Sequence, residues 1–421
     1  MATTGGCQKE DDGDAVTVTF WHSFVAATIP SLEELIDRFE EEHPGIRINA
    51  QYVPTGDGLV QKLVAAVRSG TAPDIAWIHT DFLDKLVLAD AIYPMEVFFG
   101  RPDGLSDEEL SDFFPGLLQN ASWRDTLYAL PMEATSLGLI YNKDLFRQAG
   151  LDPDRPPRTW EELAEFARHL TVDSDGDGRV EQFGFQVPVY PASGSLSVWM
   201  VLQWSPFLWQ AGGHLISTDQ TRVLYNEQPG IEALSFWKRI YDDLEIRNVA
   251  ISHDVGFASQ RFAMILDGPW DLPKFRRLPF EWAVAPLPAG PAGAATYLAG
   301  EHLAIFRQTE HPDEAWTFLK WVVQPEIQAR FSMSSGYLPV RQSTLQLDVY
   351  RDHLAGDTAL RAFVDQMDVA RARRPIDYYH VEINRHIAEA IERTTVGDED
   401  PAVVLDEAAS KSNSLLRSVQ R

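Results

Sequence analysis

The residues between 173 and 181 have the types and the spacing of a metal-binding loop. Carboxylates stand at alternate positions, a glycine permits a tight turn, and a further carboxylate follows at the ninth position, as in the first part of an EF-hand calcium loop. The twelfth position, where a bidentate glutamate normally closes such a loop, is Gly184. Four carboxylates this close together repel one another unless a cation lies among them, so we expect structural Ca²⁺ rather than a plain acidic surface turn. The expected ligands are Asp173, Asp175, Asp177, the backbone carbonyl of Arg179, and Glu181.

Aromatic side chains form the second group with chemical potential. The chain has 12 Trp, 12 Tyr and 22 Phe, which together make 11% of its residues. Most aromatic rings fill hydrophobic cores, and we assign Trp77, Trp237, Trp316 and Trp321 to the core because they lie on predicted strand or helix faces. Tryptophan beyond that need suits the apolar faces of sugars, because the ring is flat and its edge is polar.

Signatures of the common enzyme classes are missing from the sequence. It contains no Gly-x-Ser-x-Gly elbow, no Gly-x-x-x-x-Gly-Lys loop and no His-Glu-x-x-His helix. His380 and His386 would lie on different faces of a helix, so we do not expect them to share a metal. A glycoside-acting enzyme would need two facing carboxylates about 5–10 Å apart, which Glu133, Asp267 and Glu301 could supply. Nothing in the sequence brings these three together.

Length and charge exclude further classes. A chain of 421 residues predicts two domains or one unusually large one. With 45% apolar and 23% charged residues, the chain is not disordered as a whole. The 36 basic and 62 acidic side chains give a net charge of −26, which opposes unspecific binding to nucleic acids and to anionic lipid surfaces.

The single cysteine indicates a location rather than a disulfide. Cys7 follows two threonines and two glycines and precedes an acidic stretch, like the end of a bacterial lipoprotein signal whose apolar part is missing. The alternative is an ordinary thiol beside an expression scar. No run of 18 apolar residues occurs, so we expect no membrane-spanning helix. With Cys7 as the lipidation site, we expect residues 1–15 to be a lipid-anchored tether and the body to be extracytoplasmic, in the periplasm or at the cell surface.

The elements that must position these residues alternate between strands and helices. Strands at 16–21, 46–53 and 75–78 are separated by helices beginning near residues 30 and 59, the pattern of a parallel sheet covered by helices. Ligands bind at the carboxyl ends of such strands, here the loops that begin near Trp21 and His79. Later segments predict helices at 160–170, 229–243, 259–266, 315–323, 383–394 and 401–419, and extended chain at 134–141, 282–286 and 302–306.

Short motifs along the chain occur in an order that resembles a known family. They are Phe20-Trp21-His22-Ser23, Phe39-x3-His43-Pro44-Gly45-Ile46, Gly70-x-Ala72-Pro73-Asp74, Tyr141-Asn142-Lys143-Asp144-Leu145-Phe146, Thr159-Trp160-Glu161-Glu162-Leu163, Phe262-Ala263-Met264, Gly268-Pro269-Trp270 and Gly336-Tyr337-Leu338-Pro339-Val340. Their order and spacing resemble the extracytoplasmic solute-binding proteins of ABC importers, in the large family that carries mostly sugars. The resemblance covers nearly the whole chain from residue 16.

The resemblance implies an α/β fold of the periplasmic-binding-protein type II kind. Two α/β lobes would enclose a ligand cleft and be joined by crossing hinge segments. We expect residues 16–123 plus 290–341 in lobe 1, and residues 124–289 plus 342–421 in lobe 2. The solute would lie in the cleft, and the lobes would close on it.

Within this fold, rings and carboxylates in loops are the expected ligand contacts, because rings stack on pyranoses and carboxylates accept hydroxyl protons. Trp270 and Tyr337 are the strongest candidates, since both lie in loops bounded by Gly or Pro. One departure from the family pattern, Ala299-Gly300 before Glu301 in place of two glycines, puts the identity of the ligand in doubt. The candidates are Trp21, His22, Ser23, Asp81, Glu133, Trp204, Trp209, Trp270, Tyr297, Gly300, Glu301 and Tyr337.

A small basic cluster supports an alternative ligand. Arg371, Arg373 and Arg374 stand together in an acidic protein, and Arg374 could pair with a phosphate or carboxylate in the cleft. The more common role of such a cluster is to compensate nearby acidic residues on the surface, here Asp365 and Asp368. The motifs near both ends of the chain also resemble glycerol-3-phosphate and glycerophosphodiester binders of the same family.

The sequence therefore predicts a monomeric, non-enzymatic carrier of a small-molecule carbohydrate. It would bind an oligosaccharide and deliver it to the transmembrane subunits of an ABC permease, with no nucleic-acid partner. The alternatives are a glycerol-3-phosphate or glycerophosphodiester carrier and, from another class, a glycoside-acting enzyme.

Overall fold

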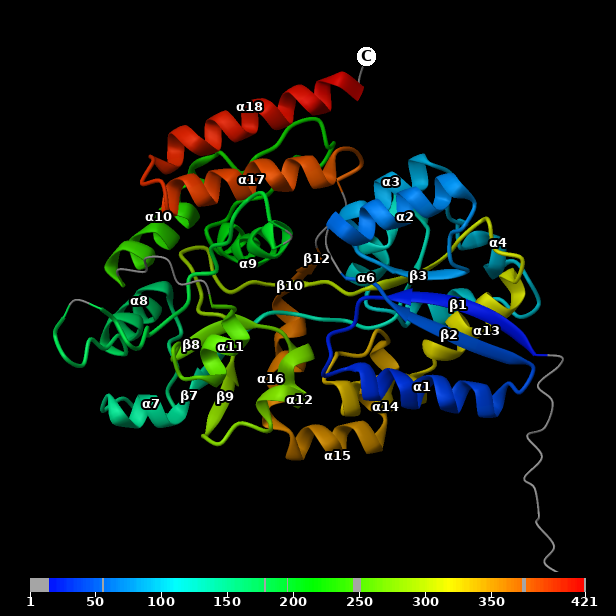
Figure 1. Ribbon diagram of the computed structural model, residues 1–421, viewed down its shortest axis with the longest axis horizontal. Coiled ribbons are helices and arrows are strands. Elements are labelled where there is room, and N and C mark those ends of the chain that lie inside the picture. The colour runs from blue at the N-terminus through cyan, green and yellow to red at the C-terminus, as the bar shows by residue number, and fades with distance from the viewer. Residues whose placement is uncertain are drawn as a thin grey trace, which may run out of the picture.

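The chain folds into two α/β lobes (Figure 1). The computed structural model describes residues 15–54, 57–177, 179–194, 196–244, 251–372 and 376–419. Cys7 of the expected tether and the candidate ligand residue Arg374 lie outside these ranges. Within them, no helix is both long enough and apolar enough to cross a lipid bilayer.

The first lobe is built on a five-stranded sheet in the order β2-β1-β3-β11-β6. Its first three strands run parallel, as predicted, whereas β11 is antiparallel to both of its neighbours. The carboxyl ends of β1 and β3 point toward the second lobe (Figure 1). The bounds are β1 Val16–His22, β2 Ile46–Tyr52, β3 Ile75–Ile78, β6 Leu130–Pro131 and β11 His302–Ile305.

Helices cover both faces of this sheet, because each presents an apolar stripe to it. In α1 (Ile29–Glu42), Leu32, Leu35, Ile36 and Phe39 recur at helical spacing and are buried. The helices α2 and α3 lie on one side of the sheet and α1 and α14 on the other (Figure 1). The further helices are α2 Asp57–Ser69, α3 Leu83–Leu88, α4 Glu96–Phe99, α5 Asp107–Ser111, α6 Pro115–Asn120, α13 Pro312–Val322 and α14 Pro325–Ser335; β4 Ser122–Trp123 and β5 Thr126–Leu127 form a small hairpin.

The second lobe contains an antiparallel sheet in the order β8-β7-β9 and most of the remaining helices. All five residues of the central strand β7 are buried, which fits a strand covered on both faces. The strands are β7 Gly138–Asn142, β8 Met264–Asp267 and β9 Trp282–Ala285. The helices are α7 Lys143–Gln148, α8 Trp160–His169, α9 Ser197–Gln210, α10 Gln228–Asp243, α11 His253–Ala258, α12 Leu272–Phe275, α16 Thr358–Asp365, α17 His380–Thr395 and α18 Pro401–Val419.

One predicted element is wrong. The segment 259–266, predicted as a helix, is a turn followed by strand β8. Its apolar run Met264-Ile265-Leu266 is short, and a buried strand of this length has no periodicity that separates it from a buried helix. The helices predicted at 160–170, 229–243, 315–323, 383–394 and 401–419 are present with slightly different ends.

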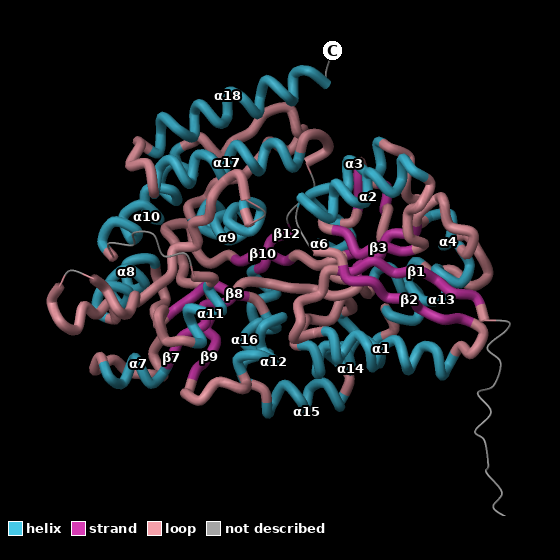
Figure 2. Tube along the Cα trace, viewed as in Figure 1, coloured by secondary structure: helices cyan, strands magenta, loops and turns pink. Residues whose placement is uncertain are grey.

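Within the described residues, three passages of the chain between the lobes can be followed. The first passage lies after residue 131, later than the expected 123, because β6 still pairs with β11. In the second, β10 (Thr296–Leu298) pairs in parallel with β12 (Ala370–Ala372), and Figure 2 shows both between the lobes. The third runs past the expected residue 341, through the 3₁₀ helix Gln342–Gln346 and α15 (Asp348–Gly356), which contacts both α14 and α16.

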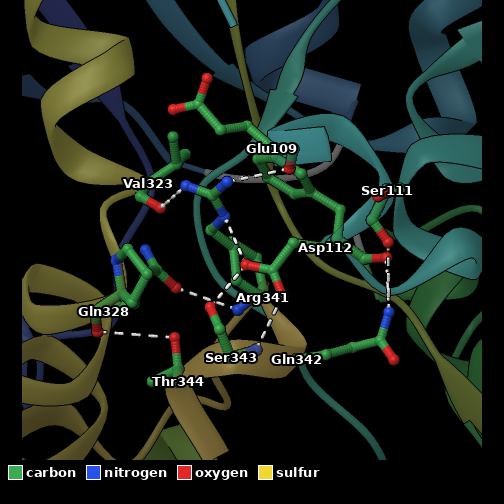
Figure 3. A network of polar contacts seen from close by, with 12 residues as sticks. Glu109, Ser111, Asp112, Val323, Gln328, Arg341, Gln342, Ser343 and Thr344 are labelled. Carbon is green, nitrogen blue, oxygen red and sulfur yellow. Dashed lines mark hydrogen bonds and ion pairs between the residues drawn. The ribbon is translucent and has the colours of Figure 1, made fainter. Parts of the chain in front are cut away.

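A buried arginine fastens the start of this third passage to the first lobe (Figure 3). The guanidinium of Arg341 meets Asp112 Oδ2 through Nε at 2.9 Å and donates to the carbonyls of Glu109 (2.9 Å) and Val323 (3.4 Å). The backbone N–H of Ser343 donates to the other oxygen of Asp112 at 2.8 Å. Each nitrogen of this guanidinium therefore contacts an oxygen. These contacts fix the position of the residues that follow Arg341 against the first lobe.

Candidate ligand-binding site

A cavity of about 600 Å³ lies between the lobes. The first lobe contributes loops at the carboxyl ends of its strands, with Ser23 after β1 and Asp81 after β3, as the parallel pattern predicts. The second lobe contributes the segment after β8 and the start of α9. A more open hollow of about 720 Å³ beside Arg276 and Asp357 is less suited to a ligand, because these two side chains already pair with each other.

Seven of the twelve described candidates lie on the cavity wall. They come from separate parts of the sequence, and three of them lie within the motifs at 20–23, 268–270 and 336–340. The seven are Ser23, Asp81, Trp270, Tyr297, Gly300, Glu301 and Tyr337.

The structure places the other five away from the wall. Trp21 does not line the cavity, and Lys62 lies 4.1 Å above its ring. His22 is buried beside Phe24, and burial lowers its pKa to about 4. Trp204 and Trp209 are buried in the core of the second lobe, and Glu133 lies behind the wall. Of the tryptophans assigned to the core, Trp237, Trp316 and Trp321 are buried there, whereas the equally buried Trp77 also borders the cavity.

Sequence reasoning missed several residues on the wall. Trp199 lies there at the start of the same helix whose Trp204 and Trp209 are buried. Helix α9 is apolar on nearly every side, so its sequence could not show which tryptophan faces the cavity. His253 and Asp271 were also missed, although Asp271 directly follows the recognised Gly-Pro-Trp motif. The remaining polar wall residues are His79, Thr80, Thr135, Asp254 and Lys274.

Aromatic rings line one part of the cavity. Trp199 and Trp270 meet edge to face with centroids 5.3 Å apart, and the ring of Tyr337 lies 6.5 Å from that of Trp270. Gly336 makes the last approach possible. Its φ is 89°, and a Cβ there would lie 2.4 Å from the carbonyl oxygen of Pro269. The loops of two motifs, one from each lobe, thus meet and present their rings together.

Two carboxyl groups lie together at the first-lobe side. Glu133 is fully buried, and within the described part of the chain neither of its carboxyl oxygens has a hydrogen-bond partner. Burial, reinforced by the neighbouring Glu301, raises the pKa of Glu133 well above its usual value. Glu301 in turn lies 3.5 Å from Nδ1 of His79. Gly300 allows this proximity, because a Cβ there would lie 2.0 Å from the carbonyl oxygen of Glu133.

A second acidic group lies on the opposite side. His253, Asp267 and Asp271 each offer an atom within 4.8 Å of the others. The Nε2 atom of His253 is 3.3 Å from Oδ2 of the fully buried Asp267; burial opposes the imidazolium, but this carboxylate prevails and raises the pKa of His253. Burial, followed by repulsion from Asp267, raises the pKa of Asp271 to about 8. Nearby, Asp254 forms an ion pair with Lys274.

Polar contacts also join the lobes beside the cavity. Nε2 of His380, on α17 of the second lobe, lies 3.1 Å from Asp81 of the first lobe. Two residues further along α17, Glu382 pairs with Lys85 at 2.8 Å. Polar contacts between the lobes therefore lie beside one edge of the cavity.

The acidic loop in the second lobe brings its carboxylates together. Oxygens of Asp173, Asp175, Asp177 and Glu181 lie within 4.8 Å of one another, and all four residues are exposed. Arg179 lies in the same loop, where its backbone N–H donates to Asp177. The glycine at the twelfth position has a packing reason, because a Cβ on Gly184 would lie 1.9 Å from the carbonyl oxygen of Ala167.

Comparisons with known proteins agree with this architecture. The family model described as bacterial extracellular solute-binding protein matches residues 26–329. A binding protein of Brucella abortus is 28% identical over 94% of this chain and 92% of its own length. The sn-glycerol-3-phosphate-binding periplasmic protein UgpB of Escherichia coli is 24% identical over 96% and 93%.

A solved structure shows the same likeness in three dimensions. The cyclic alpha-maltosyl-1,6-maltose binding protein of Arthrobacter globiformis superposes with a TM-score of 0.80 and 26% identity, covering 96% of this chain and 100% of that one. The matching family model spans more than half of the chain, and the fold matches that of the solved relative over nearly the whole chain. The chain belongs to the bacterial extracellular solute-binding proteins, the ligand-capturing components of ABC importers.

Proposed function

We propose that the cavity binds an oligosaccharide, which the protein delivers to the transmembrane subunits of its importer. The observation that carries this proposal is the group of rings made by Trp199, Trp270 and Tyr337 on the cavity wall. Such rings offer flat apolar surface to pyranoses, and neighbouring carboxylates suit their hydroxyl groups. The structural relative from Arthrobacter globiformis, named for binding a cyclic maltose-based sugar, supports the same class of ligand.

Delivery follows from the shape of the site. A solute that contacts wall residues of both lobes at once favours the closed arrangement over the open one. The closed arrangement is what the permease recognises, so the protein signals its occupancy without performing chemistry. We expect one chain to suffice, because both walls come from the same chain.

Calorimetric titration with a panel of malto-, manno- and xylo-oligosaccharides tests the proposal. For the sugar that binds, Trp270→Ala should weaken affinity at least about tenfold, since a stacked aromatic surface is lost. Trp21→Ala is the matched control, because Trp21 lies in a family motif but outside the cavity. Equal affinity of wild type and Trp270→Ala would remove Trp270 from the site.

Glycerol-3-phosphate or a glycerophosphodiester is the second candidate, favoured by the similarity to the Escherichia coli protein. A phosphate needs a cation, yet Lys274 is the one lysine or arginine among the described wall residues, and it pairs with Asp254. Arg371 is exposed on β12, away from the wall. Including both phosphates in the titration decides between the candidates.

We propose no catalytic role for the carboxylates of the site. Glycoside hydrolysis needs two carboxylates that face each other across the substrate. Glu133 and Glu301 are neighbours on one side of the cavity, and Asp267 on the other side is fully buried and does not line the wall. Prolonged incubation of the bound sugar, followed by product chromatography, should return it intact. A cleavage product that vanishes in Glu301→Gln would establish an enzyme instead.

Calcium in the loop at 173–181 remains part of the proposal. The convergence of the four carboxylates supports a cation there, bound more weakly than in a complete EF-hand, because no glutamate can occupy position 184. Addition of Ca²⁺ should raise the melting temperature, and a chelator should reverse the rise. A melting temperature of the wild type that responds no more than that of Asp175→Asn would count against the site.

We also propose that Cys7 is lipidated in the cell and anchors the body at the membrane. The small residues before Cys7 and the acidic stretch after it support this location. Fractionation of cells that express the natural precursor should place the wild type with membranes and Cys7→Ala in the soluble extracytoplasmic fraction.

A further inference from the structure

The ionisable side chains on the cavity wall are unequally balanced. Asp254 is paired with Lys274, and Asp81 lies against His380. Asp271 differs from both. It is only 8% exposed, it does not cap the helix that follows it, and it makes no ion pair with any described residue. A carboxylate this far removed from water is costly unless a positive group reaches it.

The residues behind Asp271 do not supply that positive group. Asp267 is fully buried; its Oδ1 accepts a hydrogen bond from the backbone N–H of Gly268 at 2.8 Å, and its Oδ2 faces His253. One imidazole therefore serves two carboxyl groups. Even with His253 protonated, this side of the cavity retains one negative charge when Asp271 is ionised.

Aromatic rings share the cavity wall with Asp271. The rings of Trp199 and Trp270 lie on the wall, and the ring of Trp199 also lies 5.9 Å from that of His253. A carboxylate beside aromatic faces suits a cationic nitrogen, which gains a charge-assisted contact from the first and cation–π attraction from the second. A neutral hydroxyl gains neither in full.

Resting on the proposed binding of solute in this cavity, we propose that the solute carries a cationic nitrogen, held by the carboxylate of Asp271 beside the rings of Trp199 and Trp270. The shared chemistry is a positive nitrogen on a polyhydroxylated ligand. An ammonium group on an amino sugar and the quaternary ammonium of glycerophosphocholine are the two sources that a binding experiment must separate.

The protonation state of Asp271 provides a measurable test of this proposal. The charged groups that act on Asp271 are Asp267, His253, Asp254 and Lys274, and burial with the net effect of these raises its pKa to about 8. At pH 7 the free protein therefore holds a proton on Asp271. A cation favours the ionised carboxylate, so its binding should release up to one proton, whereas a neutral sugar should release none.

The experiment is calorimetric titration of the whole chain at pH 7 and 8, in buffers of different ionisation enthalpy. The probes are the β-1,4-linked glucosamine dimer, its neutral counterpart cellobiose, the N-acetylated dimer, and glycerophosphocholine beside glycerol-3-phosphate. We expect one probe with a cationic nitrogen to bind at least about tenfold more tightly than its counterpart without that nitrogen, with proton release, and the probe that does so identifies the source.

Variants locate the effect. Asp271→Asn should reduce the preference for the cationic probe at least about tenfold and abolish proton release. Its melting curve checks folding, and Asp37→Asn, on an exposed position of α1, controls for a change in net charge. If Asp271→Asn does not fold, Trp199→Leu should reduce the same preference. Binding of neutral sugars alone, or a preference unchanged in these variants, overturns the inference and leaves the proposed function standing. Binding of none of these probes or of any oligosaccharide overturns both.

Discussion

Two buried polar clusters of this protein differ in how fully their charges are matched. Around Arg341, each nitrogen of the guanidinium contacts an oxygen of Asp112, Glu109 or Val323 (Figure 3). Around the cavity, Glu133 and Asp267 keep carboxyl oxygens without hydrogen bonds from described residues, and Asp271 has no ion pair among them. The charge of the first cluster is paired within the protein, whereas the carboxyl groups of the second remain available to a ligand in the cavity.

The difference separates a structural role from a binding role. A charge that is paired within the protein stabilises one arrangement of the chain and is not available for a ligand to contact. Unmatched carboxyl groups reduce stability in the free protein, and a ligand that matches them recovers this free energy as affinity. The contrast therefore predicts that substitutions in the two clusters have opposite patterns of effect on stability and on binding.

Breaking the Arg341 cluster should have the largest effect on stability. Arg341→Leu removes the cation that pairs with Asp112 and the donor to the carbonyls of Glu109 and Val323, so the free energy of unfolding should fall by about 3 kcal/mol. Urea titration measures this. Arg361→Leu is the control, because its pair with Asp365 is exposed and should contribute less than about 0.5 kcal/mol. Ligand affinity of folded Arg341→Leu should match the wild type, and a loss would mean that the clusters are coupled.

Asp271, in the cluster beside the cavity, should make the free energy of unfolding depend on pH. The pKa of Asp271 is raised to about 8 in the folded protein from an ordinary value of 3.8, so the folded state retains a proton that the unfolded chain has lost. Stability from this group is complete below pH 4 and is lost as the pH rises toward 8. Between pH 6 and 8 the wild type should lose about 2 kcal/mol more than Asp271→Asn. Parallel urea midpoints for the two proteins across this range would refute the assignment.

Replacing a buried carboxyl group whose neutral form is favoured should change stability little. Burial and Glu301 raise the pKa of Glu133 well above its usual value, which favours the neutral acid, and Gln resembles a neutral acid in size and polarity. Glu133→Gln should alter the free energy of unfolding by less than about 1 kcal/mol at pH 7. The folded state holds this proton more tightly than the unfolded chain does, so the wild type should lose stability relative to Glu133→Gln as the pH rises above the ordinary value of 4.5. Urea denaturation of both proteins across a range of pH tests both statements, and a large loss in the variant at pH 7 would contradict a favoured neutral acid.

The smallest effect is expected at the interlobe ion pair. Lys85 and Glu382 are partly exposed, so their pair should contribute only about 0.2–1 kcal/mol to the closed arrangement. Lys85→Met should therefore weaken ligand binding by no more than about fivefold, through the open–closed equilibrium rather than through contact with the ligand. Solution scattering of the free protein should show a more extended average shape for this variant. A loss as large as that of Trp270→Ala would place Lys85 in direct contact with the ligand.

The fold was largely predictable because its signals are local. The alternation of strands and helices over residues 16–78 predicted the parallel part of the first sheet, and the motif order predicted the two lobes. The antiparallel strand β11 was beyond local reasoning, since it enters the sheet from more than 200 residues away in the sequence. The passages between the lobes were displaced for the same reason, because strand pairing decides which lobe a segment joins.

The site was predictable where a loop carried its own signal. Loops marked by Gly and Pro contain Trp270 and Tyr337, and loops after strands contain Ser23 and Asp81. The place of these four residues on the cavity wall could therefore be deduced from their position in the sequence. Trp199 could not be separated from Trp204, because both lie on a helix that is apolar nearly all round.

The sequence by itself determined the class of fold, the loops that meet at the cavity and the convergence of four carboxylates on the loop at 173–181, because these follow from neighbours along the chain. Only the tertiary structure decided which charges are matched. One cluster is assembled from a helix, a strand end and a turn, which carry His253, Asp267 and Asp271 respectively. In the other cluster, Glu133 lies beside Glu301 because Gly300 lets two chain segments come into contact. Charge balance depends on distance and burial, which exist only once the chain is folded.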